Sequence, residues 1–168
     1  GSWTRHFQPL VEKAREEKQL CREATQTIEE NIDDVARNAY NLEVFASMGR
    51  LMETHCDLIL SIGEIAGYCD QVIQASEVDR KEEMAAGLDR MASTAEEAWK
   101  NYTATYRDLE KLWEEARYPK GEEGYVMNPQ TNYLAGRTPD LSYLILAEKV
   151  LDLPGYARDL RRMAGIYR

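Results

Sequence analysis

The chain has 168 residues, 30% of which are charged, and its formal net charge at pH 7 is −9. This length fits one domain with a buried core. Such an acidic balance disfavours nucleic acids and anionic membrane surfaces as partners, because their phosphates select for clustered Lys and Arg. The apolar runs are only a few residues long, so no transmembrane helix is predicted. Gly1 and Ser2 look like an expression scar, which suggests that the chain is a piece of a longer protein.

The first predicted helix rests on apolar residues that recur in steps of three and four. We expect it to run from about Thr4 or Phe7 to about Arg37. Asn38 and Asn41 are weak helix formers and mark a turn or a kink. The apolar row consists of Phe7, Val11, Ala14, Cys21, Ile28, Ile32 and Val35.

The second predicted helix, about Ala39–Ala75, is apolar over most of its circumference. A helix of this kind must be covered on more than one side, so we expect it to be the central helix. Its apolar residues are Val44, Phe45, Met48, Leu51, Met52, Leu58, Ile59, Ile62, Ile65, Ala66, Val72 and Ile73.

A turn is predicted at 76–79, with Ser76 or Asp79 as the N-cap of a third helix over about Asp79–Ala116. Three helices of more than thirty residues, each about 50 Å long and joined by short turns, should pack antiparallel. The sequence therefore predicts a three-helix bundle over residues 1–116.

The character of the sequence changes at Arg117. Residues 117–139 are rich in Pro, Gly and Tyr and have no helical period, so they predict a long aromatic loop. A short helix should follow from Thr138 to about Asp152, and Pro154-Gly155 should interrupt it before a last helix to about Tyr167. We expect residues 117–168 to pack on the bundle within the same domain. The predicted fold is all-α, an antiparallel bundle of three long helices with a long loop and one or two short C-terminal helices.

Histidine and cysteine residues give no support for a metal or cofactor site. The chain has only His6 and His55, and neither follows an acidic residue by three positions, as a carboxylate-bridged di-iron site would require. His55 is interpreted as a core histidine rather than a ligand. The cysteines are odd in number and do not form a disulfide framework, so we expect buried thiols. No nucleophile or phosphate-binding motif occurs, so no catalytic residue is predicted.

Two patterns on the second helix have both a structural and a functional interpretation. Glu43, Arg50, Asp57 and Glu64 form a polar stripe, either a ligand-binding seam or, as we favour, a solvated edge with Arg50 paired across a turn. Glycines at 49, 63 and 67 suggest the close approach of another element, for which tight helix packing is favoured over a ligand.

The C-terminal third carries the candidate contact surface. Charged groups interleaved with tyrosines there suit a sugar-facing or interface surface, although the same tyrosines could simply anchor the loop to the bundle. The residues of this surface are Arg117, Tyr118, Lys120, Tyr125, Arg137, Asp140 and Tyr143.

This region also carries a family resemblance. Leu112-Trp113-Glu114, then Arg117 with Pro119-Lys120-Gly121, and finally the stretch from Arg137 through Tyr143, resemble the helical region after the catalytic barrel in some bacterial family 20 glycoside hydrolases. Those enzymes are β-N-acetylhexosaminidase-like, and their catalytic Asp-Glu pair lies on a barrel strand. This chain holds no such barrel, so the resemblance implies a non-catalytic module.

The sequence thus predicts a non-catalytic helical module of a larger carbohydrate-active enzyme. Its partner would be the catalytic domain of the parent chain, or it would form a homo-oligomer, without nucleic acid, membrane or cofactor. The alternative is a free-standing helical bundle for ligand sensing or protein interaction. An unrecognised small enzyme is the third possibility.

Overall fold

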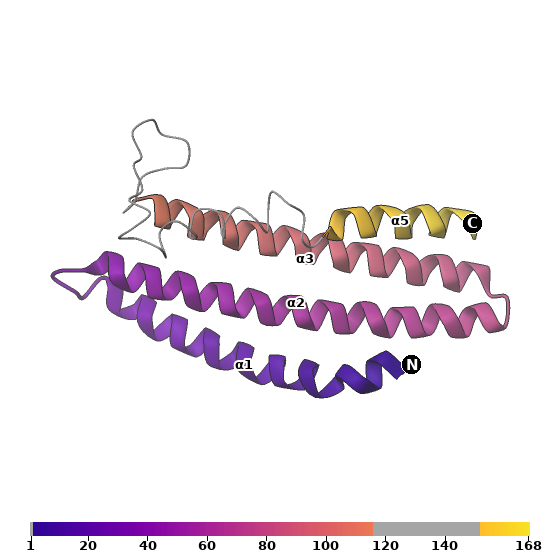
Figure 1. Cartoon of the computed structure of the whole chain (residues 1–168), viewed down its shortest axis with the longest axis horizontal. Coiled ribbons are helices and arrows are strands. Elements are labelled where there is room, and N and C mark those ends of the chain that lie inside the picture. The colour runs from indigo at the N-terminus through magenta and orange to yellow at the C-terminus, as the bar shows by residue number, and fades with distance from the viewer. Residues whose placement is uncertain (1, 116–151) are drawn as a thin grey trace, which may run out of the picture.

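A computed structural model describes residues 2–115 and 152–168, which form four helices and no strand. Helix α1 covers Ser2–Ile32, α2 covers Ala39–Glu77, α3 covers Lys81–Glu115 and α5 covers Leu153–Ile166. The three long helices run antiparallel through short connections (Figure 1). The predicted all-α fold with three long antiparallel helices is confirmed. The expected loop at 117–139 and the expected helix from Thr138 lie outside the described residues.

The helices lie side by side in the order α1, α2, α3, α5 (Figure 1). Helix α2 packs on both α1 and α3, whereas α5 packs on α3. Within the described ranges, the backbone of α1 does not approach that of α3, nor does α2 approach α5. The second helix is therefore central, as predicted. Because α1 and α3 flank it on two sides, most of its apolar residues are partly buried, and Phe45, Met48, Met52 and Ile73 stay exposed.

The best-buried core lies between α3 and α5. Alanines on both helices let the backbones approach, while larger side chains fill the space around them. Arg161 of α5 holds this contact from outside, with Nη2 2.6 Å from Oε2 of Glu96. The core residues are Ala85, Leu88, Met91, Ala92, Ala95, Leu153, Ala157, Leu160 and Ala164.

Two glycines allow α1 to pack closely against α2. A Cβ atom at Gly49 would lie 2.1 Å from the Thr25 hydroxyl oxygen, and one at Gly63 would lie 3.0 Å from a methyl group of Val11. The prediction of tight helix packing is confirmed at these positions. A Cβ atom at Gly67 would meet nothing within 4 Å, so Gly67 does not share this role.

Helix α1 ends five residues earlier than predicted, at Ile32 instead of Arg37. Asn31 turns its side chain back to the carbonyl of Thr27, at 2.7 Å, and acidic residues at 33 and 34 favour turns over helix. Asn38 then takes the left-handed conformation, with φ 66°, directly before α2 begins. The break is therefore a turn rather than a kink, because Asn tolerates this backbone conformation.

The predicted start of the third helix is also wrong. Helix α3 begins at Lys81, and Asp79 has φ 53°, which is outside the range of a helix N-cap. The other cap candidate, Ser76, lies within α2 and donates its hydroxyl to the carbonyl of Ile73.

Pro154-Gly155 lies in the first turn of the last helix rather than before it. Asp152 is the N-cap of α5, and its carboxylate accepts a hydrogen bond from the backbone N–H of Gly155 at 3.1 Å. Proline is well tolerated in the first helical turn, where its missing N–H costs nothing.

Candidate functional site

The predicted contact surface cannot be placed. Its seven members, Arg117, Tyr118, Lys120, Tyr125, Arg137, Asp140 and Tyr143, lie outside the described residues and remain a prediction. Several grooves run beside α2 within the described residues, and two of them, one polar and one apolar, lie along its middle. Asp57 lines the first and His55 lines the second. Residues two positions apart on a helix are separated by about 200° around its axis. Asp57 and His55, and the grooves that they line, therefore lie on opposite sides of α2.

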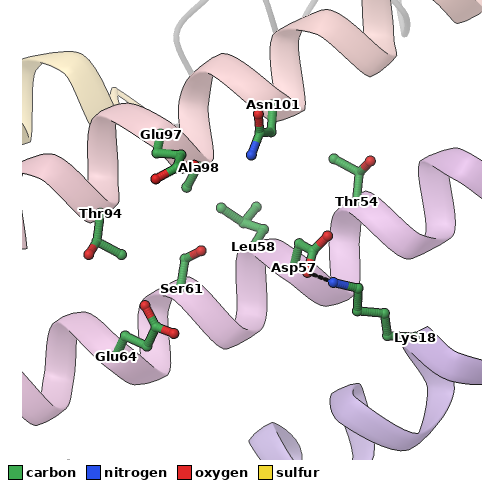
Figure 2. Close-up of a pocket in the computed structure, with 10 residues that line it drawn as sticks. All are labelled: Lys18, Thr54, Asp57, Leu58, Ser61, Glu64, Thr94, Glu97, Ala98 and Asn101. Atoms are coloured by element: carbon green, nitrogen blue, oxygen red, sulfur yellow. Dashed lines mark hydrogen bonds and ion pairs between the residues drawn. The ribbon is translucent and has the colours of Figure 1, made fainter.

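The polar groove lies mainly between α2 and α3 and has a volume of about 320 Å³ (Figure 2). Lys18 of α1 pairs with Asp57 at one end, and the hydroxyl groups of Thr54 and Thr105 lie 2.9 Å apart. The remaining lining residues are Leu58, Ser61, Glu64, Thr94, Glu97, Ala98 and Asn101. These short polar and acidic side chains are of the kind that water solvates readily.

The ion pairs of the polar stripe support its interpretation as a solvated edge. Arg50 pairs with Glu29 across the turn between α1 and α2, as predicted. Asp57 has its own partner in Lys18. Exposed pairs of this kind fix side chains with little net stabilisation. Pairing of these charges with α1 accounts for them without a ligand.

The apolar groove lies between α1 and α2 and has a volume of about 430 Å³. Its floor is apolar and contains two of the thiols, with one carboxylate at the rim. The lining residues are Glu17, Leu20 and Cys21 of α1, and Met52, His55, Cys56 and Ile59 of α2. Burial is the main factor that raises the pKa of the Cys56 thiol, with nearby acidic groups adding to it. The Cys56 thiol therefore stays protonated and unreactive at neutral pH.

His55 lies at the edge of this groove rather than in the core, so its interpretation as a core histidine is wrong. The residue as a whole is exposed. Its ring contacts Tyr102 and Tyr106 of α3, with centroid distances of 5.8 and 6.3 Å. Partial desolvation there lowers the pKa of His55. The imidazole is therefore neutral at pH 7 and suits an apolar surface.

A single row of side chains runs along α2 and includes Met52, His55 and Ile59 of the apolar groove. We define the α2 apolar row as the positions that recur in steps of three and four from residue 45 to residue 73. Phe45 is 58% exposed, Met52 57% and Ile73 51%, although each was predicted to be covered. The row consists of Phe45, Met48, Met52, His55, Ile59, Ile62, Ala66, Cys69 and Ile73.

The sequence contains a signal for this row in its seven-residue repeats. Positions 49, 56, 63 and 70 repeat every seven residues and lie towards α1, as the contacts of Gly49 and Gly63 show. Positions 51, 58, 65 and 72 repeat in the same way towards α3, where Val72 meets Gly87. The α2 apolar row is a third stripe between these two, and Cys69 within it packs on the α3–α5 core.

The described residues contain no group of three or more His, Cys, Asp or Glu side chains that could hold a metal ion. None of the described helices combines the length and apolar character needed to cross a bilayer.

No protein-family model, curated protein or solved structure matches this chain. The relation to family 20 glycoside hydrolases therefore remains a resemblance of the C-terminal third.

Proposed function

We propose that this chain is a non-catalytic helical module of a larger carbohydrate-active enzyme, which packs on the catalytic domain or holds copies of the protein together. The resemblance over residues 112–143 suggests the enzyme class. The α2 apolar row supports a role in packing, and it is the observation that carries the proposal.

The exposure of this row is what distinguishes a module from a self-sufficient domain. Soluble monomers seldom expose long contiguous apolar surfaces, and those that do use them to contact other proteins or ligands. Phe45, Met48 and Met52 are each at least half exposed. Phe and Met are enriched in the cores of protein interfaces, where Lys and Glu are depleted. The row has the composition of an interface core.

The alternative, a free-standing ligand-sensing or interaction domain, would be favoured by one pocket lined by Arg50, His55 and Asp57. The structure does not bring these three side chains together. Arg50 and Asp57 pair with Glu29 and Lys18 of α1, whereas His55 lines the apolar groove on the other side of α2. The packing module is therefore the better supported function.

The natural reading frame upstream of Trp3 tests this proposal. We expect several hundred codons of alternating strand and helix, with an acidic pair on one strand. A frame that begins near Trp3 would contradict the module proposal and leave a free-standing interaction bundle.

A binding measurement tests the same proposal in the protein. The upstream domain and this chain, produced separately, should associate in solution. Because the candidate surface is in the C-terminal third, Arg137→Ala with Tyr143→Ala should weaken that binding, while Lys111→Ala on the exposed side of α3 serves as the control. Absence of binding between the two intact parts would count against the proposal.

A further inference from the structure

We propose that the α2 apolar row and the neighbouring face of α1 form the contact between two copies of this chain, packed antiparallel about a two-fold axis at the level of Ile59. This inference rests on the proposed function, because it commits to self-association as one of its roles. Three independent features of the described residues lead to it.

The first feature is a size gradient along the α2 apolar row. Phe45, Met48 and Met52 lie in its N-terminal half, whereas its C-terminal half contains the small residues Ala66 and Cys69 between Ile62 and Ile73. The row spans about 42 Å at 1.5 Å per residue, and Ile59 is its midpoint.

An antiparallel arrangement about Ile59 matches large side chains with small ones. It places Met52 level with Ala66 of the second copy, Met48 within one residue of the level of Cys69, and Phe45 level with Ile73. A parallel arrangement would put large residues opposite large ones at one end and leave a gap at the other. Since interfaces pack as densely as protein interiors, the antiparallel arrangement is favoured.

The second feature concerns the α1 side chains at the level of this axis. Residues that meet across the α1–α2 contact have numbers that add to 74, as in Val11 with Gly63 and Thr25 with Gly49. Residue 15 of α1 is therefore level with Ile59 of α2. A two-fold axis at this level pairs α1 residues whose numbers lie symmetrically about 15.

The α1 side chains at these symmetric positions are complementary. Leu10 and Leu20 are 48% and 64% exposed, and the axis places Leu10 level with Leu20 of the second copy. Leu20 also lines the same groove as Met52 and Ile59, so α1 and α2 contribute to one continuous face.

The third feature is charge complementarity at the centre of α1. Lys13 and Glu17 are exposed and lie symmetrically about residue 15, with Nζ of Lys13 3.4 Å from Oε1 of Glu17 within one copy. The two-fold axis brings Lys13 level with Glu17 of the second copy. Two copies then form a group of four alternating charges rather than a repulsive pair, which favours this register.

Disulfide cross-linking of the full chain tests the axis. The native cysteines at 21, 56 and 69 are first replaced by Ala, and helicity and solution mass are checked against the native chain. Ile59→Cys and Met52→Cys are then introduced separately and oxidised with glutathione disulfide. Ile59→Cys should form a covalent dimer on the order of tenfold faster or more, because two residues at the axis meet the Cα separation a disulfide needs. Two copies of position 52 would be about 21 Å apart along the helix.

A second variant keeps the test valid if the cysteine-free chain does not fold. Met48→Cys in the native chain should cross-link to Cys69 of the second copy, and peptide mapping identifies the bond. Cross-linking of Met52→Cys as fast as Ile59→Cys overturns the antiparallel arrangement. No covalent dimer from either Ile59→Cys or Met48→Cys overturns the dimer itself. In that case the module proposal is still tested by the reading frame and by the domain-binding measurement, so the two proposals can fail separately.

Discussion

The α3–α5 contact and the α2 apolar row use similar residue types but differ in how far they are covered. On α5, Leu160 is 5% exposed and Ala157 and Ala164 are fully buried, whereas on α2, Phe45 and Met52 are more than half exposed. The first contact is complete within the described residues. The second has the same kind of apolar stripe, in which His55 and Cys69 contact α3 and the α3–α5 core while Phe45, Met48, Met52 and Ile73 stay exposed. These exposed side chains are the part of the row that the proposed contact would cover.

Truncation of one side chain in each region should give the largest contrast. Leu160→Ala should destabilise the chain by about 2–5 kcal/mol, because it leaves a cavity in the buried core. Met52→Ala should change the unfolding free energy by less than about 0.5 kcal/mol in dilute solution, where the exposed side chain loses few contacts.

Urea denaturation at several protein concentrations measures both effects. The loss for Leu160→Ala should not depend on concentration, whereas the loss for Met52→Ala should grow as the protein becomes more concentrated. Equal losses at every concentration would remove the distinction between the two regions.

The α1–α2 contact should be intermediate in sensitivity. Gly49→Leu should destabilise the chain by about 1–3 kcal/mol, because its Cβ atom would collide with Thr25 and force the helices apart. Gly67→Ala is the matched control in the same helix. It meets no atom within 4 Å, and should stabilise the chain by up to about 1 kcal/mol through helix propensity. A neutral Gly49→Leu would show that α1 does not pack on α2 as described.

The outer ion pair of the α3–α5 contact should give the smallest effect, and one that depends on pH. The hydrogen bond from Arg161 lowers the pKa of Glu96 below its ordinary value of 4.5. The pair therefore contributes stability above that pH, and the contribution is lost as the pH falls through the folded-state pKa. Thermal unfolding of the native chain and Glu96→Gln should differ at pH 6–7, and the difference should shrink as the pH is lowered below 4.5. A difference that does not shrink in acid would point to another cause.

Periodicity predicted the helices and their order because each apolar row recurs with the spacing of a helix face. It misplaced the end of α1 and the start of α3, where Asn31 and Asp79 adopt local conformations that a row of apolar residues does not report. It also placed Phe45 and Met52 in the core. An apolar stripe shows that a helix face needs a neighbour, but not whether the same chain provides it. Whether α1 and α3 close over α2 depends on packing between distant segments.

The candidate contact surface of the C-terminal third was chosen from residue types alone. Its tyrosines and arginines lie outside the described residues, so it stays a prediction. His55 shows the limit of such reasoning in the described part. Its position among apolar residues indicated a core site, yet that stripe of α2 is the exposed one.

Sedimentation equilibrium of the full chain tests most directly whether the α2 apolar row is an interface. The account predicts that the native chain is a dimer at micromolar concentration, and that Met52→Glu is a folded monomer of about half the mass because it places a carboxylate within the apolar row. Gln74→Glu, at an exposed position of α2 outside the row, is the control and should remain dimeric. A native chain that is monomeric throughout the micromolar range, or a Met52→Glu variant as dimeric as the native chain, would contradict the account.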